Sequence, residues 1–444
     1  MKRPVHSRSP FLGAAGIHET ETAMPSSQPP DRRVFLGAAS VLGSTISSKA
    51  SGQTSESRAP VQLTERARKL HKDCLIADGH NDLPWALREK EDVVFGKFDL
   101  RTLQKSLHTD MVRLREGNVG LQFWSAYVPA ETRNKKTALR TTLEQMDLVH
   151  RLVQTYPDHL GFARNSRDVE QVRGSGKIAS LIGLEGGHSM DQSLAVLRML
   201  HGLGASYMTL THSETTEWAD SATDTPKHNG LSPFGEKVVQ EMNRLGMLVD
   251  ISHVSPACMA HALRVARAPL IFSHSSMRTI ADHPRNVPDD ILRLLRDNGG
   301  VVMVNFYSGF VVPEAARLTT RMFEQARELR KRFPEDQAYR EAMVQWRKEN
   351  PVPSGSIHHV VDHIEHGIRV AGEDHVGLGS DFDGIPTVPR QLEDVSTYPL
   401  LTQELMNRGH RESTIRKILG ENTLRVMREA EKRSAELAKN KVTG

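Results

Sequence analysis

Residues 74–82 read Cys-Leu-Ile-Ala-Asp-Gly-His-Asn-Asp, so a short apolar run ends directly in a group of polar side chains. The same arrangement recurs along the chain, where an ionisable residue follows an apolar, β-rich run: Glu185 after 178–184, His212 after 206–211, His253 after 247–252, His274 after 269–273 and Asp381 after 375–380. Ionisable side chains at the carboxyl ends of several strands are typical of a (β/α)8 barrel, because the chemistry of that fold lies on that face. The sequence therefore predicts an α/β protein, a (β/α)8 TIM barrel whose strand ends share one polar site.

Eight apolar runs have the length and composition of buried parallel strands, continuous rather than alternating. They span residues 74–78, 121–127, 178–184, 206–210, 247–251, 269–272, 301–306 and 376–379. Helical patterns lie between them, over residues 193–203, 233–245, 255–266 and 288–297. Eight strands with intervening helices favour a closed barrel over a doubly wound sheet.

One highly charged segment, 313–350, exceeds what a minimal barrel needs between strands seven and eight. Its apolar residues recur every three to four positions in two stripes, which predicts a pair of helices. We expect this insertion to lie over the mouth of the barrel, as a lid or an oligomer contact. A solvated decoration with no role in catalysis is an equally open interpretation.

Composition sets the broad class of the protein. The 444 residues are 38% hydrophobic, which is enough for one large domain with a sizeable core. The net charge is +4 and the pI about 9.0, but residues 1–50 hold six basic and three acidic residues, so most of the surplus lies there. Without a basic stripe interleaved with aromatic residues, nucleic-acid binding is not expected.

The first 50 residues resemble an export signal. Arg32-Arg33-Val34-Phe35-Leu36 matches the twin-arginine pattern, and a mild apolar stretch and small residues up to Ala50 follow it. We predict a disordered export signal over 1–50, a linker over 51–62, a metallohydrolase domain over 63–435 and a polar tail over 436–444. The mature protein would be periplasmic or secreted, and no stretch is long and apolar enough for a stable membrane span. A disordered N-terminus that contains Arg-Arg by chance, and a start at Met24, stay open.

Two cysteines and four further histidines also need an interpretation. Cys74 falls in a predicted strand and Cys258 in a predicted helix, and we expect both to be buried apolar thiols rather than a disulfide or a nucleophile. The histidines have metal-like spacing on one predicted helix: His358, His359, His363 and His366. The chain lacks a His-Glu-x-x-His signature, and this helix precedes strand eight outside the barrel, so we expect a solvated face.

The strand-end residues favour a metal. His80 and Asp82 are two positions apart, so in an extended strand end both side chains point the same way. Imidazole and carboxylate groups without thiolates suit a catalytic zinc-type centre rather than a closed structural site. As an isolated pair they would be weak evidence, but together with Glu185, His253 and His274 they predict a metal site.

Several longer motifs carry a resemblance to a known family. They are Asp78-Gly79-His80-Asn81-Asp82, Gly183–Ser189, Thr211-His212-Ser213, Trp218-Ala219-Asp220, Asp250–Ser255, Ser273–Ser276, Arg285–Asp290 and Gly379–Gly384. In this order and spacing they resemble the membrane (renal) dipeptidase family, a branch of the metal-dependent amidohydrolases, from about Leu63 to about Glu431. A bacterial member is what the leader and the insertion suggest.

The resemblance implies a centre with two Zn2+ ions. His80 and Asp82 would hold one zinc, His253 and His274 the other, and Glu185 would bridge them as part of the catalytic machinery. Two such ions share a water whose pKa falls to near neutrality. Asp381 would be the catalytic base, His212 would orient substrate or stabilise the oxyanion, and Arg285 would bind the substrate carboxylate. The alternatives are a helix cap for Asp381, a structural histidine for His212 and a surface ion pair for Arg285.

The expected function is therefore hydrolysis of the peptide bond of small dipeptides. An amidohydrolase of the same superfamily that acts on an N-acyl amino acid, a lactone or a β-lactam amide is the main alternative. A non-catalytic binding protein of the envelope is the third, although a binder needs no proton shuttle such as Asp381. Family members are commonly homodimers. The loop 213–217 departs from the family pattern through its extra charge, so substrate preference is less certain than the chemistry.

Overall fold

The protein is described by a computed structural model that covers residues 58–89 and 99–442. The predicted export signal and most of the predicted linker lie outside the described residues, so export and periplasmic location stay predictions. Within the described part, no helix combines the length and apolar character that a membrane crossing requires.

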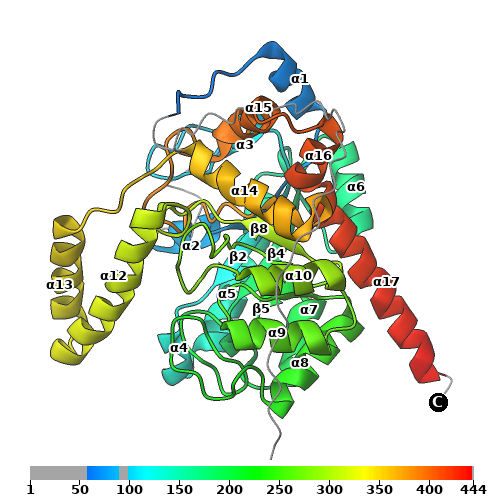
Figure 1. Ribbon diagram of the computed structural model, residues 1–444. Coiled ribbons are helices and arrows are strands. Elements are labelled where there is room, and N and C mark those ends of the chain that lie inside the picture. Colours follow the sequence, from blue (N-terminus) through cyan, green and yellow to red (C-terminus); the bar gives the residue numbers. More distant parts are fainter. Residues whose placement is uncertain (1–57, 90–98, 443–444) are drawn as a thin grey trace, which may run out of the picture. The chain divides into compact units, whose positions relative to one another are not determined.

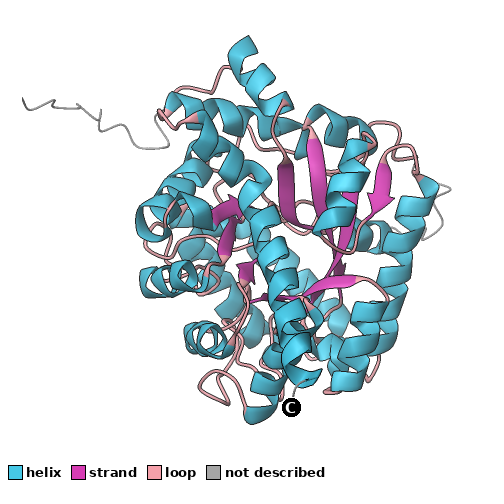
Figure 2. Ribbon diagram, turned by 90° about the vertical axis from the view of Figure 1, so that its right-hand side faces the viewer, coloured by secondary structure: helices cyan, strands magenta, loops and turns pink. Residues whose placement is uncertain are grey.

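Eight parallel strands form a closed barrel with helices around it (Figures 1 and 2). The strands are β1 Ile76–Asn81, β2 Val119–Tyr127, β4 Ile178–Glu185, β5 Ala205–Thr209, β6 Leu248–Asp250, β7 Ile271–Phe272, β8 Val301–Val304 and β9 Val376–Leu378. Neighbours pair in the order β2-β1-β9-β8-β7-β6-β5-β4, and a seven-residue ladder from Leu121↔Ala179 to Tyr127↔Glu185 closes the ring. The predicted TIM barrel and its eight strands are confirmed.

A ninth strand, β3 Leu160–Phe162, was not predicted from the sequence. It pairs in parallel with Ile178–Ser180 at the start of β4, while β5 pairs further along the same strand from Ile182 onward. Three residues with a central glycine give no periodic signal, and only the neighbouring strand makes this segment extended.

The inward face of the barrel is set by alternation along each strand. In β4, Ala179 and Leu181 belong to one buried apolar cluster, whereas Ile178, Ile182 and Leu184 belong to another that includes the surrounding helices. Because side chains alternate between the two faces, Glu185 shares its face with Ala179 and Leu181. The strand is buried on both faces, which is why the sequence shows a continuous apolar run, yet its register directs Glu185 into the barrel.

The helices connect the strands and cover the barrel. Those before β5 are α1 Glu65–Lys72, α2 Leu83–Glu89, α3 Met111–Glu116, α4 Glu131–Asn134, α5 Ala138–Thr155, α6 Ser166–Gly174 and α7 Leu194–Gly202. The later ones are α8 Pro233–Leu245, α9 Pro256–Val265, α10 Asp289–Asn298, α11 Ser308–Val311, α12 Pro313–Arg332, α13 Asp336–Glu349, α14 Ile357–Ala371, α15 Tyr398–Asn407, α16 Glu412–Arg416 and α17 Asn422–Val442. The sequence had placed α7 to α10 within one or two residues.

Capping explains where α8 and α10 begin and end. Ser232 accepts the backbone N–H of Gly235 and Pro233 opens α8, while Gly246 ends it in the left-handed region at φ 76°. Helix α10 begins after Pro288 with two aspartates in its first turn, which favour the positive end of the helix dipole. These start and stop signals are local, so the sequence alone predicts them.

The predicted helical insertion is confirmed: it forms two consecutive helices, α12 and α13, at one side of the barrel (Figure 1). Arg327 of α12 donates to the carbonyl of Thr223 at 3.1 Å, so the pair is tied to the long loop after β5.

The two predicted thiols are also confirmed, since Cys74 and Cys258 are free and buried.

The end of the predicted linker is held against the barrel domain. Gln391 both donates to the carbonyl of Val61 at 2.9 Å and accepts its N–H at 2.8 Å. The carbonyl of Ala59 contacts His358 at 3.0 Å. At the other end of the chain, helix α17 continues through most of the predicted polar tail, to Val442.

Candidate active site

Four histidines converge on one buried carboxylate at the carboxyl ends of the strands. The Oε2 atom of Glu185 lies 3.4 Å from His80 Nε2, while its Oε1 atom lies 3.1 Å from His253 Nε2 and 3.6 Å from His274 Nε2. His80 Nε2 also lies 3.2 Å from Asp82 Oδ2, and His212 Nε2 lies 3.7 Å from Glu185 Oε1. The Oε2 atom of Glu185 therefore faces His80, whereas its Oε1 atom faces the other three histidines.

These residues have the donor set of a metal centre. The five predicted ligands, together with His212 and Asp381, form three overlapping groups whose ligand atoms lie within 4.8 Å of one another. His80 Nε2 is buried and has no hydrogen-bond partner among the described residues. Burial alone would raise the pKa of Glu185, but the surrounding histidines, His80 foremost, hold it well below its ordinary value. A charged carboxylate and an orphaned imidazole nitrogen fit a bound cation.

Asp381 lies beside this group in the loop that follows β9. Its backbone is in the left-handed region at φ 67°, its N–H donates to the carbonyl of His80, and its Oδ2 accepts from Asn305 Nδ2 at 2.8 Å. Burial raises the pKa of Asp381 well above its ordinary value, and the nearby carboxylates of Asp82 and Glu185 add to this effect. Since no helix begins at this residue, the alternative interpretation as a helix cap is wrong.

Arg285 is a buried cation rather than a surface residue. Its side chain is 2% exposed, and it donates to Ser275 Oγ at 3.3 Å and to the carbonyl of His274 at 3.2 Å. Burial lowers the pKa of Arg285 to about 10. Within the described residues it has no carboxylate within salt-bridge distance, so the alternative of a surface ion pair is wrong. Such a guanidinium is ready for an anionic ligand.

A cleft of about 540 Å³ opens over these residues. The functional candidates that line it are Asp82, Glu185, His212, His253, Arg285 and Asp381. Aromatic and apolar walls surround them, formed by Trp85, Tyr127, Tyr307, Phe310, Met322, Phe323 and Ile385. Met322 and Phe323 belong to α12 and Arg347 to α13, so the insertion forms part of the cleft wall; a lid or oligomer role stays a prediction.

The extra acidic residues of the loop after β5, Glu214 and Glu217, do not face the cleft. Arg133, just after β2, contacts Glu214 Oε2 at 3.1 Å, Glu217 Oε1 at 3.8 Å and the carbonyl of Thr215 at 2.8 Å. Neither glutamate lines the cleft, whereas Ser213 does. The extra acids of this loop therefore anchor it to Arg133.

Two motif residues, His188 and Asp383, have local roles. His188 Nε2 contacts the carbonyl of Val128 at 3.2 Å, and burial lowers the pKa of this histidine to about 4. Asp383 accepts the N–H of His108 at 2.7 Å and returns its own N–H to the ring of that residue. Asp383 therefore joins two loops.

Sequence reasoning overlooked the residues that hold the candidate ligands in place. Ser125 donates to Glu185 Oε2 at 3.1 Å, Tyr207 contacts His80 Nδ1 at 2.8 Å, and Asn305 binds Asp381. Asn305 stands out as a polar residue within the otherwise apolar run 301–306, which is the one signal that the sequence offered, whereas the run 206–210 around Tyr207 holds other polar residues. Their partners lie 76 and 127 positions away, so the contacts themselves were not predictable.

The four histidines of α14 are not a solvated face, and that prediction is wrong. All four are buried, with at most 6% of their surface exposed. His358 contacts Glu404 at 2.9 Å, His363 bridges the N–H of Met277 and the carbonyl of Val311, and His366 contacts Asp289 at 2.7 Å. His359 completes a capping box with Ser356 at the start of the helix. Because α14 packs between the barrel and α15, its polar stripe meets protein rather than water.

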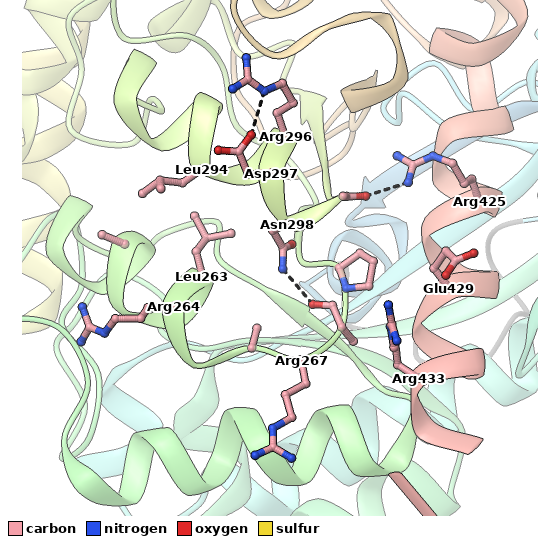
Figure 3. A pocket seen from close by; sticks show the side chains of 15 residues that line it. Leu263, Arg264, Arg267, Leu294, Arg296, Asp297, Asn298, Arg425, Glu429 and Arg433 are labelled. Carbon is pink, nitrogen blue, oxygen red and sulfur yellow. Dashed lines mark hydrogen bonds and ion pairs between the residues drawn. The ribbon is translucent and has the colours of Figure 1, made fainter. Parts of the chain in front are cut away.

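A second, larger hollow of about 920 Å³ lies near the opposite ends of the strands, where Pro269 and Gly299 precede β7 and β8. Figure 3 shows its arginines spread around the rim, with Arg296 turned to Asp297 and Arg425 to a backbone carbonyl. Arg264 and Arg267 point away from each other. None of the predicted site residues line this hollow, and its guanidinium groups do not converge.

A parallel eight-stranded barrel with histidines and carboxylates gathered at the carboxyl ends of its strands is the architecture of a metal-dependent hydrolase. The family model described as membrane dipeptidase (peptidase family M19) matches residues 64–441. The chain therefore belongs to the membrane dipeptidase family, and it is an enzyme of the metallopeptidase class.

Similar proteins agree with this assignment, and similar solved structures share the fold. The chain is 40% identical to dipeptidase verJ of Clonostachys rogersoniana over 84% of this chain and 88% of that protein, and 40% identical to dipeptidase 3 of Mus musculus over 83% and 67%. The fold matches the probable dipeptidase PvdM from Pseudomonas aeruginosa with a TM-score of 0.71 at 24% identity, over 83% of this chain and 98% of that one. It also matches a metallo peptidase from Rhodobacter sphaeroides, liganded with a phosphinate mimic of L-Ala-D-Ala, with a TM-score of 0.66 at 22% identity, over 80% and 99%.

Proposed function

We propose that this protein is a zinc-dependent dipeptidase that hydrolyses the peptide bond of small dipeptides. One observation carries the proposal: the two oxygens of the buried Glu185 face different histidines, in the same cleft as a buried arginine that has no carboxylate partner among the described residues. The first part fits two cations and the second fits the carboxylate of a substrate.

The metal would be held by the residues that converge at the strand ends. His80 and Asp82 would bind one zinc, His253 and His274 the other, and Glu185 would bridge them. The separation of the Glu185 oxygens, with Oε2 toward His80 and Oε1 toward His253, supports this division. When bound, two such ions supply Lewis acidity and a water with a pKa near neutrality.

Asp381 would move the proton. A general base for hydrolysis must take a proton from the attacking water and later deliver it to the leaving amine. Its burial and the raised pKa fit a group that changes protonation during turnover, and Asn305 fixes its Oδ2 while Oδ1 stays available. His212 lines the same cleft beside Glu185, where it would orient the substrate carbonyl or stabilise the developing oxyanion.

Arg285 would set the length of the substrate. A guanidinium can bind a carboxylate with two parallel hydrogen bonds, so a free carboxylate at a fixed distance from the reacting bond would be required. The similar metallo peptidase from Rhodobacter sphaeroides is liganded with a mimic of L-Ala-D-Ala. We therefore extend the proposal to dipeptides with a D-residue at the C-terminal position.

The test is hydrolysis of a matched panel by the purified protein: L-Ala-L-Ala, L-Ala-D-Ala, L-Ala-L-Ala amide and N-acetyl-L-alanine. We expect turnover of the free dipeptides, loss of turnover with a chelator, and little activity on the amide. Preferential hydrolysis of N-acetyl-L-alanine, or full activity on the amide, would contradict a dipeptidase and favour another amidohydrolase.

Arg285→Lys sharpens the same test. Charged hydrogen bonds contribute about 1.5–3 kcal/mol each, so kcat/KM for dipeptides should fall roughly 10- to 100-fold. The matched control is Arg278→Lys, since this half-buried arginine of the same loop donates to the carbonyl of Pro284 and does not line the cleft.

A further inference from the structure

In two of the candidate ligand histidines, the Nδ1 atom contacts a hydroxyl group, and the two hydroxyl groups come from different residues. His80 Nδ1 lies 2.8 Å from the Tyr207 hydroxyl, and His274 Nδ1 lies 2.8 Å from Ser273 Oγ. All four residues are at most 1% exposed, so water does not compete for these contacts. No partner of His253 Nδ1 is found in residues 58–89 and 99–442.

The remaining contacts of each hydroxyl decide which atom carries the proton. Ser273 Oγ lies 2.6 Å from Asp250 Oδ2, and a carboxylate only accepts, so the serine proton goes to Asp250. The serine oxygen must then accept from His274 Nδ1–H. Likewise the Tyr207 hydroxyl donates to the carbonyl of Gly79 at 3.2 Å, which leaves its oxygen to accept from His80 Nδ1–H.

The carboxylate of Asp250 accepts four hydrogen bonds. Its Oδ1 accepts the backbone N–H of Ser252 and of Ser273, and its Oδ2 accepts from Thr209 Oγ1 as well as Ser273 Oγ. These donors come from the ends of β5, β6 and β7, so the aspartate joins three strands and at the same time directs the serine proton.

From these contacts we infer that Tyr207 and the Ser273–Asp250 pair are positioning residues, which hold His80 and His274 in the tautomer that carries its proton on Nδ1 and turns the Nε2 lone pair toward Glu185. The inference rests on the proposed metal centre. It assigns one fixed histidine to each cation. Tyr207 holds His80, a ligand of the cation shared with Asp82, and Ser273 holds His274, a ligand of the cation shared with His253. A neutral imidazole with its other nitrogen hydrogen-bonded is a better and better-oriented ligand.

The chain offers matched controls for both hydroxyls. Ser380 precedes Asp381 as Ser273 precedes His274, and it donates to the buried Asp78 at 2.7 Å, but it contacts no imidazole. Tyr398 is as buried as Tyr207 and also donates to Asp78, at 2.8 Å. Ser380 also contacts the backbone carbonyl of His80, at 3.3 Å. Ser380→Ala and Tyr398→Phe therefore remove an equivalent buried hydroxyl without removing a contact to the imidazole of a ligand histidine.

The experiment measures zinc affinity of the apo protein by competition with a chromophoric chelator, without any substrate. Loss of a hydrogen bond behind a metal ligand typically costs about 10- to 100-fold in metal affinity. We expect Tyr207→Phe and Ser273→Ala each to lower the affinity for one of the two zinc ions by that factor. Ser380→Ala and Tyr398→Phe should leave both affinities within about threefold of the unmodified protein.

Single-site backgrounds identify the ion affected. In Asp82→Ala, where the remaining zinc would depend on His253 and His274, Ser273→Ala should still weaken binding and Tyr207→Phe should not; His253→Ala should reverse the pattern. Equal weakening of both ions, or effects no larger than in the controls, would overturn the inference while leaving the dipeptidase intact. An unmodified protein that binds no zinc would instead overturn the proposed metal centre.

Discussion

Two sets of four histidines, all buried except the half-buried His212, differ in what their ring nitrogens meet. The mouth histidines (His80, His212, His253 and His274) turn Nε2 toward Glu185, and His80 Nε2 has no hydrogen-bond partner among the described residues. The α14 histidines (His358, His359, His363 and His366) each meet a backbone group, a carboxylate or a capping serine.

Burial does not separate the two sets. Burial lowers the pKa of His253 and of His274 well below the ordinary value, and it lowers the pKa of His363 to about 4. His253, His274 and His363 are therefore neutral imidazoles at neutral pH. The difference lies in where the nitrogens point. The Nε2 atoms of His253 and His274 lie 2.8 Å apart beside Glu185, and that of His80 has no hydrogen-bond partner among the described residues. A cation would stabilise nitrogens that converge in this way, whereas a nitrogen that meets its own separate protein group is unavailable to a metal.

The largest effect is expected at the carboxylate shared by the mouth histidines. Glu185→Gln removes the charge that two cations would share, so metal content should fall. Dipeptide hydrolysis should drop about a thousandfold or more, since such a centre supplies several kcal/mol. The matched control is Glu404→Gln, a buried glutamate that contacts His358. Metal analysis and kinetics on both variants check this, and a fully active Glu185→Gln would contradict the proposed centre.

Asp381→Asn tests the proposed general base, which lies beside the mouth histidines. The asparagine keeps the shape and the contact with Asn305 but cannot take a proton, so kcat should fall by about 10²- to 10⁴-fold. Metal content should stay unchanged. Asp383→Asn, two positions away and joined to His108, is the control and should keep most of the activity. An Asp381→Asn variant with unchanged kcat would exclude this residue as the base.

The smallest effect on chemistry is expected in the α14 set. His363→Ala removes the ring between the N–H of Met277 and the carbonyl of Val311, so the free energy of unfolding should fall by about 1–3 kcal/mol. Metal content and kcat should not change. Urea unfolding together with metal analysis measures both, and loss of metal in this variant would show that the two sets are not independent.

The same variant has a predicted pH signature. The unfolded chain binds a proton at this histidine near pH 6.5, whereas the folded protein does so only near pH 4. The stability that the neutral ring contributes is therefore complete above pH 6.5 and is lost as the pH falls toward 4. Unfolding measured at pH 7 and pH 5 should show a smaller loss on acidification in His363→Ala than in the unmodified protein or in His201→Ala. An equal loss in all three would contradict this.

The sequence by itself determined the barrel and the residues of its candidate site. Apolar runs that end in His80, Glu185, His253 and His274 are local patterns, and the carboxyl ends of parallel strands must meet on one face. Helix limits such as Pro233 and Gly246 are local as well. For these features the determining physics acts within a few residues, so it can be read without coordinates.

Tertiary structure alone decided which polar groups are satisfied and which are not. It buried Arg285 with no carboxylate partner in the described part of the chain, paired the α14 histidines, made Leu160–Phe162 a strand and placed Tyr207 and Ser273 behind two candidate ligands. Most of these features depend on residues far away in the chain. The contact of Ser273 with His274 is between neighbours, but its direction depends on Asp250, 23 positions away. Hydrogen-bond satisfaction and burial are properties of the folded surroundings, so one residue type, histidine, serves two different purposes here.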